Sequence, residues 1–409
     1  MNAQDEKFMQ SALKLAEKGI SSVEPNPAVG CVIVKAGQLV GKGYHKKFGG
    51  PHAEVNAIED CRALGITPEG GTMYVTLEPC GHQGKTGPCA EVIIKAGITR
   101  VVAATMDPSE HANGKGLEQL RQAGIEVEVG LCEQEARLLN APFFKHLTTG
   151  KCWVVLKWAQ SIDGKLAYAD RSPENRWITN EASRSDAHKL RRRVGAILVG
   201  INTVLADDPL LTPRPSKGRK PVRVVLDGSL RTPLGCRLLR TTKTSPVLIY
   251  THKAAVDANP QQADQVREKG AELLVYEGPG PSADQVGWGL PHHSANGGAS
   301  PTLPDSYLNL PFLLADLSQR GVQQILVEGG PHVAASFLRE GLVDEVCVYM
   351  APRILGSRGT ACISEPMASL GQTVGLHHVQ IKAFGEDVRI SGRLESGVAL
   401  ERLSTTNLR

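Results

Sequence analysis

The sequence predicts an α/β protein built from two domains. Short apolar runs typical of buried strands alternate with helix-like segments along most of the 409 residues. The chain is also two to three times longer than a usual domain of roughly 100–150 residues. Hydrophobic residues make up 41% and charged residues 22%, which is ordinary for a folded chain. The alternation pauses in small polar residues near 147–150, so we expect domains at residues 1–147 and 151–409.

The first domain shows strands and helices in βαβ order. Apolar runs bounded by Gly, Pro and polar residues predict strands at 28–34, 72–77, 100–105 and 125–129. Helix-like segments lie between them, at 53–64, 89–96 and 116–123. This order predicts a complete α/β domain.

The second domain alternates in the same way. Strands are expected at 152–157, 196–200, 222–227, 246–250, 272–276, 324–328 and 345–350, and helices at 181–192, 313–319 and 332–340. Alternation of this kind predicts a mainly parallel sheet flanked by helices. Residues 277–311 are rich in Gly, Pro, Ser and Asn, which predicts a flexible insertion.

The composition of the sequence limits the classes of partner that we expect for the protein. The net charge is +4 and aromatic residues make up only 4%, so nucleic acid is not indicated as a partner. No run approaches the ~18 apolar residues of a membrane helix, and residues 1–7 do not resemble a signal peptide, so we expect a cytoplasmic enzyme without a membrane partner. The nine cysteines are unevenly spaced, which favours reduced thiols, some of them metal-bound.

Three short segments bring together the ligands of a catalytic zinc site. His52 opens an expected helix, Cys80 follows an expected strand, and Cys89 opens the next helix. Zinc prefers imidazole and thiolate, and three protein ligands are typical of a catalytic zinc whose fourth position holds water. Glu54 follows His52 by two residues, where a carboxylate outside the ligand set can carry protons. This order is the signature of zinc-dependent nucleobase deaminases, although eight residues separate the cysteines instead of two.

The surrounding residues point to one family. Residues 26–30 (NPAVG), 43–54 and 78–89 (EPCGHQGKTGPC) resemble the deaminase half of the bifunctional riboflavin-biosynthesis deaminase/reductases. The resemblance covers about the first 147 residues and implies a cytidine-deaminase-like α/β/α fold. It implies hydrolysis of the 2-amino group of a diaminopyrimidinone with a phosphoribosylamino side chain. It also implies that this phosphorylated small molecule is held by Asn26, His45, His82, Lys85 and Thr86.

Two places depart from the pattern of the family. Gly87 stands where the family has proline, which gives the unfolded chain more freedom ahead of Cys89. Residues 107–114 (DPSEHANG) lack a second Asn-Pro-like element. This leaves open whether the segment contacts the substrate.

The second half resembles the reductase half of the same family. No Gly-x-Gly-x-x-Gly motif follows its first strand, and the glycines after the strand at 324–328 could form a simple turn into a helix. Residues 157–164 (KWAQSIDG), 177–179 (WIT), 200–212 (GINTVLADDPLLT) and 328–330 (EGG) carry the resemblance. It implies a dihydrofolate-reductase-like α/β fold, NADPH as cofactor, and reduction of the ribosyl side chain, as its open imine, to ribityl.

Carried over onto this sequence, the resemblance implies two sets of residues in the second half. The NADPH site would contain Ala159, Trp177, Thr203, Asp207, Gly228, Gly330, Pro331, His332, Val333, Ala334, Ala335 and Ser336. The substrate would contact Asn175, Arg191, Leu211, Arg214 and Glu328. The arginines would face its phosphate, because a guanidinium fork matches phosphate oxygens. The proton donor stays open between Asp207, Glu328 and solvent. The family also implies a homo-oligomer.

Two other functions stay open on the sequence. The zinc core could edit a flipped base in a nucleic acid, although the low aromatic content does not favour this. Alternatively, the second half could be a non-catalytic scaffold for a monofunctional deaminase. Failure to bind or oxidise NADPH, with deamination intact, would favour the scaffold.

Overall fold

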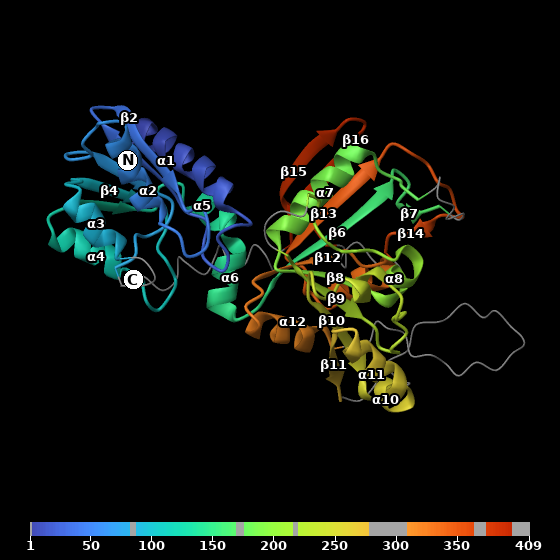
Figure 1. Ribbon diagram of the computed structural model, residues 1–409. Helices are drawn as coiled ribbons and strands as arrows, with labels where there is room; N and C mark the ends of the chain where they lie inside the picture. The colour runs from blue at the N-terminus through green and yellow to red at the C-terminus, as the bar shows by residue number, and fades with distance from the viewer. Residues whose placement is uncertain are drawn as a thin grey trace, which may run out of the picture. The chain divides into compact units, whose positions relative to one another are not determined.

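The chain divides into two compact units between Lys151 and Cys152. The computed structural model describes residues 2–81, 87–168, 176–215, 220–277, 309–363 and 374–394 (Figure 1). Residues 278–308 of the predicted insertion lie outside the described residues. Among the helices of the described ranges, none is both long enough and apolar enough to cross a membrane.

The first unit is a sheet covered by helices on both faces. Its strands are β1 (Gly30–Lys35), β2 (Gln38–Tyr44), β3 (Thr72–Val75), β4 (Arg100–Ala103) and β5 (Glu126–Val129), in the order β2-β1-β3-β4-β5. β1 pairs antiparallel with β2 and β3, whereas β3, β4 and β5 run parallel. The helices are α1 (Ala3–Ala16), η1 (Glu17–Gly19), α2 (Ala53–Ala63), α3 (Cys89–Lys95), α4 (Lys115–Gln122), α5 (Glu133–Leu139) and α6 (Ala141–Thr149).

Successive side chains of a strand point to opposite faces of the sheet, and β1 therefore contributes to two cores. Ile33 packs with side chains of α2, α3 and α4, whereas Val32 packs with α1 and α5 on the other face. A Cβ atom at Gly30 would lie 2.0 Å from the carbonyl oxygen of Ala12. Only glycine therefore lets α1 approach β1 this closely. The result is a three-layer α/β/α unit.

The second unit is built on a larger, mainly parallel sheet. The described strands form the order β11-β10-β9-β8-β12-β6-β13-β16-β15. Their bounds are β6 (Trp153–Ser161), β8 (Ala196–Gly200), β9 (Val222–Leu226), β10 (Val247–His252), β11 (Glu272–Tyr276), β12 (Gln324–Val327), β13 (Glu345–Ala351), β15 (His377–Phe384) and β16 (Asp387–Arg393). The strands from β11 to β13 run parallel, and β16 and β15 add an antiparallel edge. β7 (Lys165–Ala167) and β14 (Thr360–Ala361) form a separate pair.

Helices cover both faces of this sheet. They are α7 (Glu181–Arg193), α8 (Ile201–Asp207), α9 (Arg237–Arg240), α10 (Lys253–Ala258), α11 (Pro260–Glu268), α12 (Leu310–Gln319) and α13 (Pro331–Arg339). α12 and α13 bury apolar side chains with alternate residues of β6, β8 and β12. α7 lies across β6 and β13 (Figure 1), where Asp186 accepts a hydrogen bond from the hydroxyl of Tyr349 (2.8 Å). The carboxyl ends of β9, β8, β12 and β6 therefore lie side by side, the edge where open α/β sheets bind ligands.

The predicted elements are present, with ends that differ by a few residues. The strands expected at 196–200 and 272–276 coincide with β8 and β11. The elements not predicted from the sequence are α1, η1, β2, α5 and α6 in the first unit and β7, α8, α9, α10, α11, β14, β15 and β16 in the second.

Candidate active sites

His52, Cys80 and Cys89 converge in the first unit, and their ligand atoms all lie within 4.8 Å of one another. His52 caps α2, Cys80 follows β3, and Cys89 is the first residue of α3. Nδ1 of His52 lies 3.2 Å from Sγ of Cys89 and 3.6 Å from Sγ of Cys80. The three residues come from separate elements and meet at the same end of the sheet.

The spacing of these atoms fits a tetrahedral zinc. Zn–N and Zn–S bonds of roughly 2.0 and 2.3 Å place the nitrogen and sulfur of a tetrahedral site about 3.5 Å apart. The two measured N···S distances are close to this value. Two thiolates and one imidazole would leave one position for water, as in catalytic sites. The residues therefore fit the predicted metal.

The environment of Cys80 favours its thiolate form. A hydrogen bond from the Cys89 thiol lowers the pKa of Cys80 to about 4, and His52 acts in the same direction. The backbone N–H of Cys89 also donates to Sγ of Cys80 (3.4 Å). The same thiol contact and burial raise the pKa of Cys89. Since thiolates are the metal ligands, Cys80 is prepared for binding.

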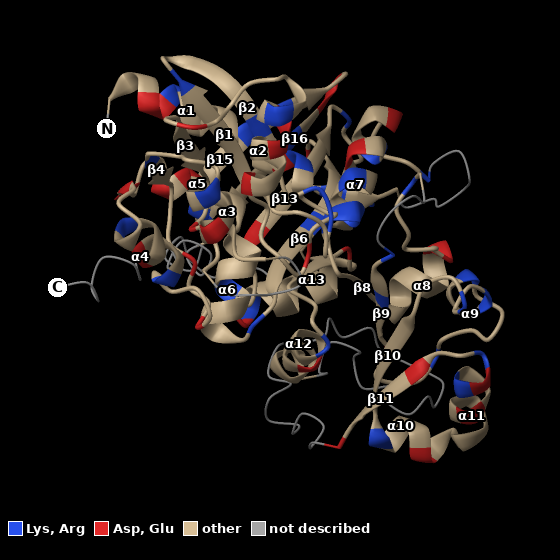
Figure 2. Cartoon of the chain, turned by 60° about the vertical axis from the view of Figure 1, so that its left-hand side comes forward, with Lys and Arg blue, Asp and Glu red and all other residues tan. Residues whose placement is uncertain are grey.

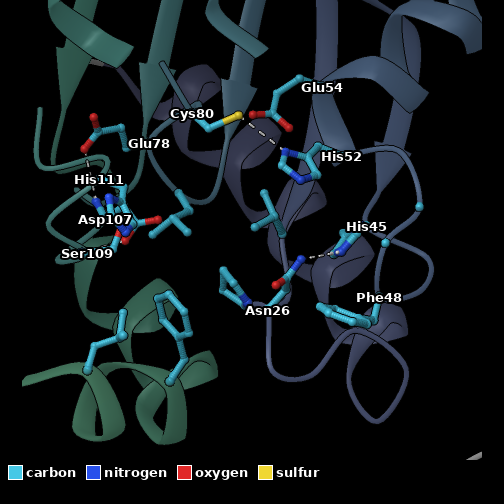
Figure 3. Close-up of a pocket in the computed structure, with 17 residues that line it drawn as sticks. Asn26, His45, Phe48, His52, Glu54, Glu78, Cys80, Asp107, Ser109 and His111 are labelled. Atoms are coloured by element: carbon cyan, nitrogen blue, oxygen red, sulfur yellow. Dashed lines mark hydrogen bonds between the residues drawn. The ribbon is translucent and has the colours of Figure 1, made fainter. Parts of the chain in front are cut away.

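Glu54 lies in the first turn of α2 beside the three ligands and is 3% exposed. Burial raises the pKa of its carboxyl group. A raised pKa makes the carboxyl group a better proton acceptor, as a group that accepts and returns a proton in the reaction requires. Figure 3 shows Glu54 next to His52 and Cys80 at the cavity wall.

These residues border a cavity of about 350 Å³. Asn26 and His45 lie on one side of it (Figure 3). Nδ1 of His45 lies 3.0 Å from the carbonyl oxygen of Pro51, so this nitrogen is the donor. Nε2 of His45 then accepts from the amide of Asn26 (3.3 Å), which turns the oxygen of Asn26 away from His45. Burial lowers the pKa of His45, in keeping with a neutral ring.

Many residues that line the cavity were not predicted from the sequence. The additional lining residues are Pro27, Val29, Phe48, Gly49, Gly50, Leu77, Glu78, Asp107, Ser109, His111, Phe143 and Leu147. The 107–111 segment, which departs from the family pattern, thus borders the cavity (Figure 3). Phe143 and Leu147 are four residues apart, so they lie on one face of α6. This spacing could have predicted the shared face, but not that the face borders a cavity. His82, Lys85 and Thr86 lie outside the described residues.

In the second unit, the residues predicted for NADPH follow neighbouring strands at the carboxyl edge. Ala159 lies in β6, Thr203 in the first turn of α8 after β8, and Gly228 shortly after β9. Gly330 caps α13, whose first residues are Pro331, His332, Val333, Ala334, Ala335 and Ser336. A Cβ atom at Gly329 would lie 2.5 Å from Cβ of Val333, so the turn after β12 has no room for a side chain. This glycine cradle fits a dinucleotide phosphate.

Trp177 and Asp207 are connected through Arg176. The guanidinium groups of Arg176 and Arg184 lie 5.1 and 5.0 Å from the centre of the Trp177 ring, which is 54% exposed. Arg176 also donates to the carbonyl oxygen of Asp207 (3.1 Å) at the end of α8. The exposed indole is therefore held beside the carboxyl edge of the sheet.

Of the residues predicted for the substrate, Arg191 contacts Glu328, which lies directly after β12. Arg191, in the last turn of α7, donates to both carboxylate oxygens of Glu328 (2.8 and 2.7 Å) and to the carbonyl oxygen of Thr212 (3.3 Å). Leu211 is buried next to Thr212 with a φ of 51°, and Asn175 lies outside the described residues. Figure 2 shows Lys and Arg along much of α7.

Nearby charged groups shift the pKa values of Glu328 and His188 in this cluster. Burial raises the pKa of Glu328, but Arg191 and Lys157 outweigh burial and lower it to about 2. Burial, Arg191 and Arg214 together lower the pKa of His188 to about 4. The site is therefore a carboxylate surrounded by cations, which suits an anionic ligand.

Two family models and several known proteins match this chain along most of its length. Residues 2–105 match the family model of the cytidine and deoxycytidylate deaminase zinc-binding region, and residues 152–390 match that of the RibD C-terminal domain. The riboflavin biosynthesis protein RibD of Aquifex aeolicus is 41% identical, over 94% of this chain and 97% of that protein. The chain belongs to the RibD family.

Other RibD relatives agree along the same length. The riboflavin biosynthesis protein RibD of Escherichia coli is 38% identical, over 94% of this chain and 98% of that protein. The structure of Acinetobacter baumannii RibD has a TM-score of 0.75 and 34% identity, covering 96% of this chain and 99% of that one. A Thermotoga maritima structure, titled a diaminohydroxyphosphoribosylaminopyrimidine deaminase/5-amino-6-(5-phosphoribosylamino)uracil reductase, has a TM-score of 0.75, 33% identity and the same coverage.

Membership of the RibD family confirms the predicted family and fold class. The chain is a bifunctional enzyme of riboflavin biosynthesis that combines a zinc-binding deaminase domain with an NADPH-dependent RibD reductase domain. The two alternatives, a nucleic-acid editor and a monofunctional deaminase on a scaffold, are not favoured by these relatives.

Proposed function

We propose that the chain catalyses two consecutive reactions on one phosphorylated pyrimidine. Residues 1–147 would hydrolyse the 2-amino group of 2,5-diamino-6-(5-phosphoribosylamino)pyrimidin-4(3H)-one, releasing ammonia. Residues 151–409 would then reduce the ribosyl side chain of the product to ribityl. The observation that carries the proposal is the His52, Cys80 and Cys89 cluster with buried Glu54 beside a cavity.

Glu54 is the proton carrier of the proposed deamination. His52, Cys80 and Cys89 would hold zinc, which when bound supplies a water that is activated at neutral pH. Glu54 accepts a proton from the attacking water and delivers a proton to the leaving amine. Its burial supports this role, since burial raises its pKa and so its affinity for the proton.

Asn26 and His45 are proposed to bind the pyrimidine. Their mutual hydrogen bond fixes both side chains at the cavity wall. Such a fixed pair loses little conformational entropy when a planar ring binds. His82, Lys85 and Thr86 are proposed to extend this contact toward the phosphate.

In the reductase domain, Gly330 and the first turn of α13, with Ala159, Trp177, Thr203, Asp207 and Gly228, are proposed to hold NADPH, which when bound supplies the hydride. Arg191, Arg214, Glu328, Leu211 and Asn175 would orient the open-chain imine of the substrate. The hydride adds to the imine carbon and a proton adds to its nitrogen. Cations around Glu328 support recognition of a phosphate.

The decisive experiment supplies the purified protein with the diaminopyrimidinone compound, with and without NADPH, and identifies products by mass. We expect the deaminated ribosyl compound without NADPH and the ribityl compound with NADPH. Deamination without any reduction would instead support the scaffold alternative. Cytoplasmic location, homo-oligomeric assembly and the lack of a nucleic acid partner stay predictions.

A further inference from the structure

Glu78 is a buried carboxylate that the reaction outlined above does not use. It precedes Cys80 by two residues and is 4% exposed. Its Oε2 accepts the backbone N–H groups of Asp107 (3.2 Å) and Gly114 (3.0 Å), and its Oε1 accepts that of Gly116 (3.2 Å). One side chain thus satisfies three backbone donors that lie 29, 36 and 38 residues further along the chain.

The segment that Glu78 binds forms one wall of the cavity. Asp107, Ser109 and His111 lie within it and border the cavity near the zinc ligands (Figure 3). A segment between a strand and a helix has few backbone partners of its own. The three hydrogen bonds from its two ends to one carboxylate therefore define its path.

Further contacts join the same two parts of the chain. The backbone N–H of Glu78 donates to the carbonyl oxygen of Thr105 (2.9 Å), and the amide of Gln119 donates to that of Gly81 (2.9 Å). A Cβ atom at Gly116 would lie 1.8 Å from the carbonyl oxygen of Pro79, so the backbones touch. Residues 78–81, which contain the ligand Cys80, are thus joined closely to the cavity wall.

We propose that Glu78 is a positioning residue for the deamination. It holds residues 107–116 in the path that presents Ser109 and His111 to the polar groups of the substrate. Because the carboxylate binds backbone N–H groups, the segment can differ from the family in sequence and still keep its path. The proposal rests on the proposed deaminase function, and it adds a group that touches neither the metal nor the substrate.

The test uses the full-length, zinc-loaded chain with Glu78→Gln and Glu78→Leu. Glutamine can keep the hydrogen bonds from Asp107 and Gly114 to one oxygen, but its NH2 group cannot accept the bond from Gly116. Leucine loses all three bonds. Glu118→Gln is the matched control, because Glu118 is an exposed carboxylate on α4. The measurements are amide hydrogen exchange of residues 106–116, zinc content, and KM and kcat of both reactions.

We expect faster exchange in residues 106–116 and a KM of deamination raised about tenfold in Glu78→Gln, the size of one hydrogen bond to a charged group. Glu78→Leu should raise KM further. Zinc content, the kcat of deamination and the reduction should change by less than about threefold, in contrast to the loss of a group that acts on the reacting atoms.

Unchanged exchange in Glu78→Leu, or faster exchange with an unchanged KM, would overturn the proposal. Parallel loss of zinc and kcat would also overturn it, because Glu78 would then support the ligand segment instead of the substrate wall. A wild-type chain that does not deaminate would contradict the proposed function itself, and the wild-type arm separates that failure from the others.

Discussion

Arg191 and Glu328 join the last turn of α7 to the carboxyl end of β12 through two hydrogen bonds of 2.8 and 2.7 Å. Both residues were predicted to contact the substrate, and the structure shows that they also bind each other. Arg191 reaches the carbonyl oxygen of Thr212 as well, so one guanidinium group connects three segments of the reductase domain. The ion pair is therefore part of the site's architecture as well as a candidate contact for the substrate.

Arg191→Ala should raise the KM of the reduction at least tenfold with little effect on deamination. The change removes the proposed phosphate contact and leaves the carboxylate of Glu328 without its bidentate partner. Arg193→Ala is the control, because Arg193 is an exposed residue of the same helix turn. Steady-state kinetics of both reactions check the prediction. An equal loss in both assays would indicate a folding defect instead.

Glu328 should not be the proton donor of the reduction. Its pKa of about 2 keeps the carboxyl group ionised throughout the range from pH 5 to 8. The pH profile of kcat in that range should therefore have the same shape in wild type and Glu328→Gln, although the variant is slower. A limb of the wild-type profile that vanishes in the variant would contradict this prediction. Confirmation would leave Asp207 or solvent as the donor.

The zinc residues could be predicted from the sequence because their positions follow from short-range rules. A helix start or a strand end lies beside each ligand, so motif spacing and secondary structure together define the cluster. Glu78 could not be found in this way. Its partners are backbone N–H groups 29 to 38 residues away, and backbone groups leave no trace in a sequence.

β2 is another element that short-range sequence rules do not predict. This strand contains Gly41 and Gly43, and glycine is unfavourable in strands, so the local signal is weak. A Cβ atom at Gly41 would lie 2.3 Å from Sγ of Cys61, and one at Gly43 would lie 2.3 Å from the carbonyl oxygen of Ala53. The close packing of α2 on β2 requires these glycines, and that requirement exists only in the folded unit.

Glu54→Gln should abolish ammonia release, with a loss in kcat of at least about 100-fold, while zinc stays bound. The amide keeps the size of the carboxylate but cannot carry the proton. Glu59→Gln is a suitable control, since Glu59 is an exposed residue of α2. Ammonia release, zinc content and NADPH oxidation with the deaminated substrate would be measured together. Deamination at a nearly normal rate would refute the assignment of Glu54.

Asp5 should stabilise the deaminase domain fully above about pH 4 and progressively less as the pH falls below that value. Arg100 donates to both of its oxygens (3.1 and 3.3 Å), and this pairing holds the pKa of Asp5 well below its usual value near 3.9. A lowered pKa in the folded state gives stability that is present above the unfolded pKa and is lost as the pH falls below it. Asp5→Asn should therefore reduce the free energy of unfolding by about 2 kcal/mol at pH 7, and the deficit should shrink toward pH 3. Hydrogen exchange of buried amides in β1 and β3 at several pH values measures this deficit, with Glu6→Gln, an exposed change on α1, as the control. A deficit of equal size at pH 7 and pH 3 would show that Asp5 acts through packing and not through its charge.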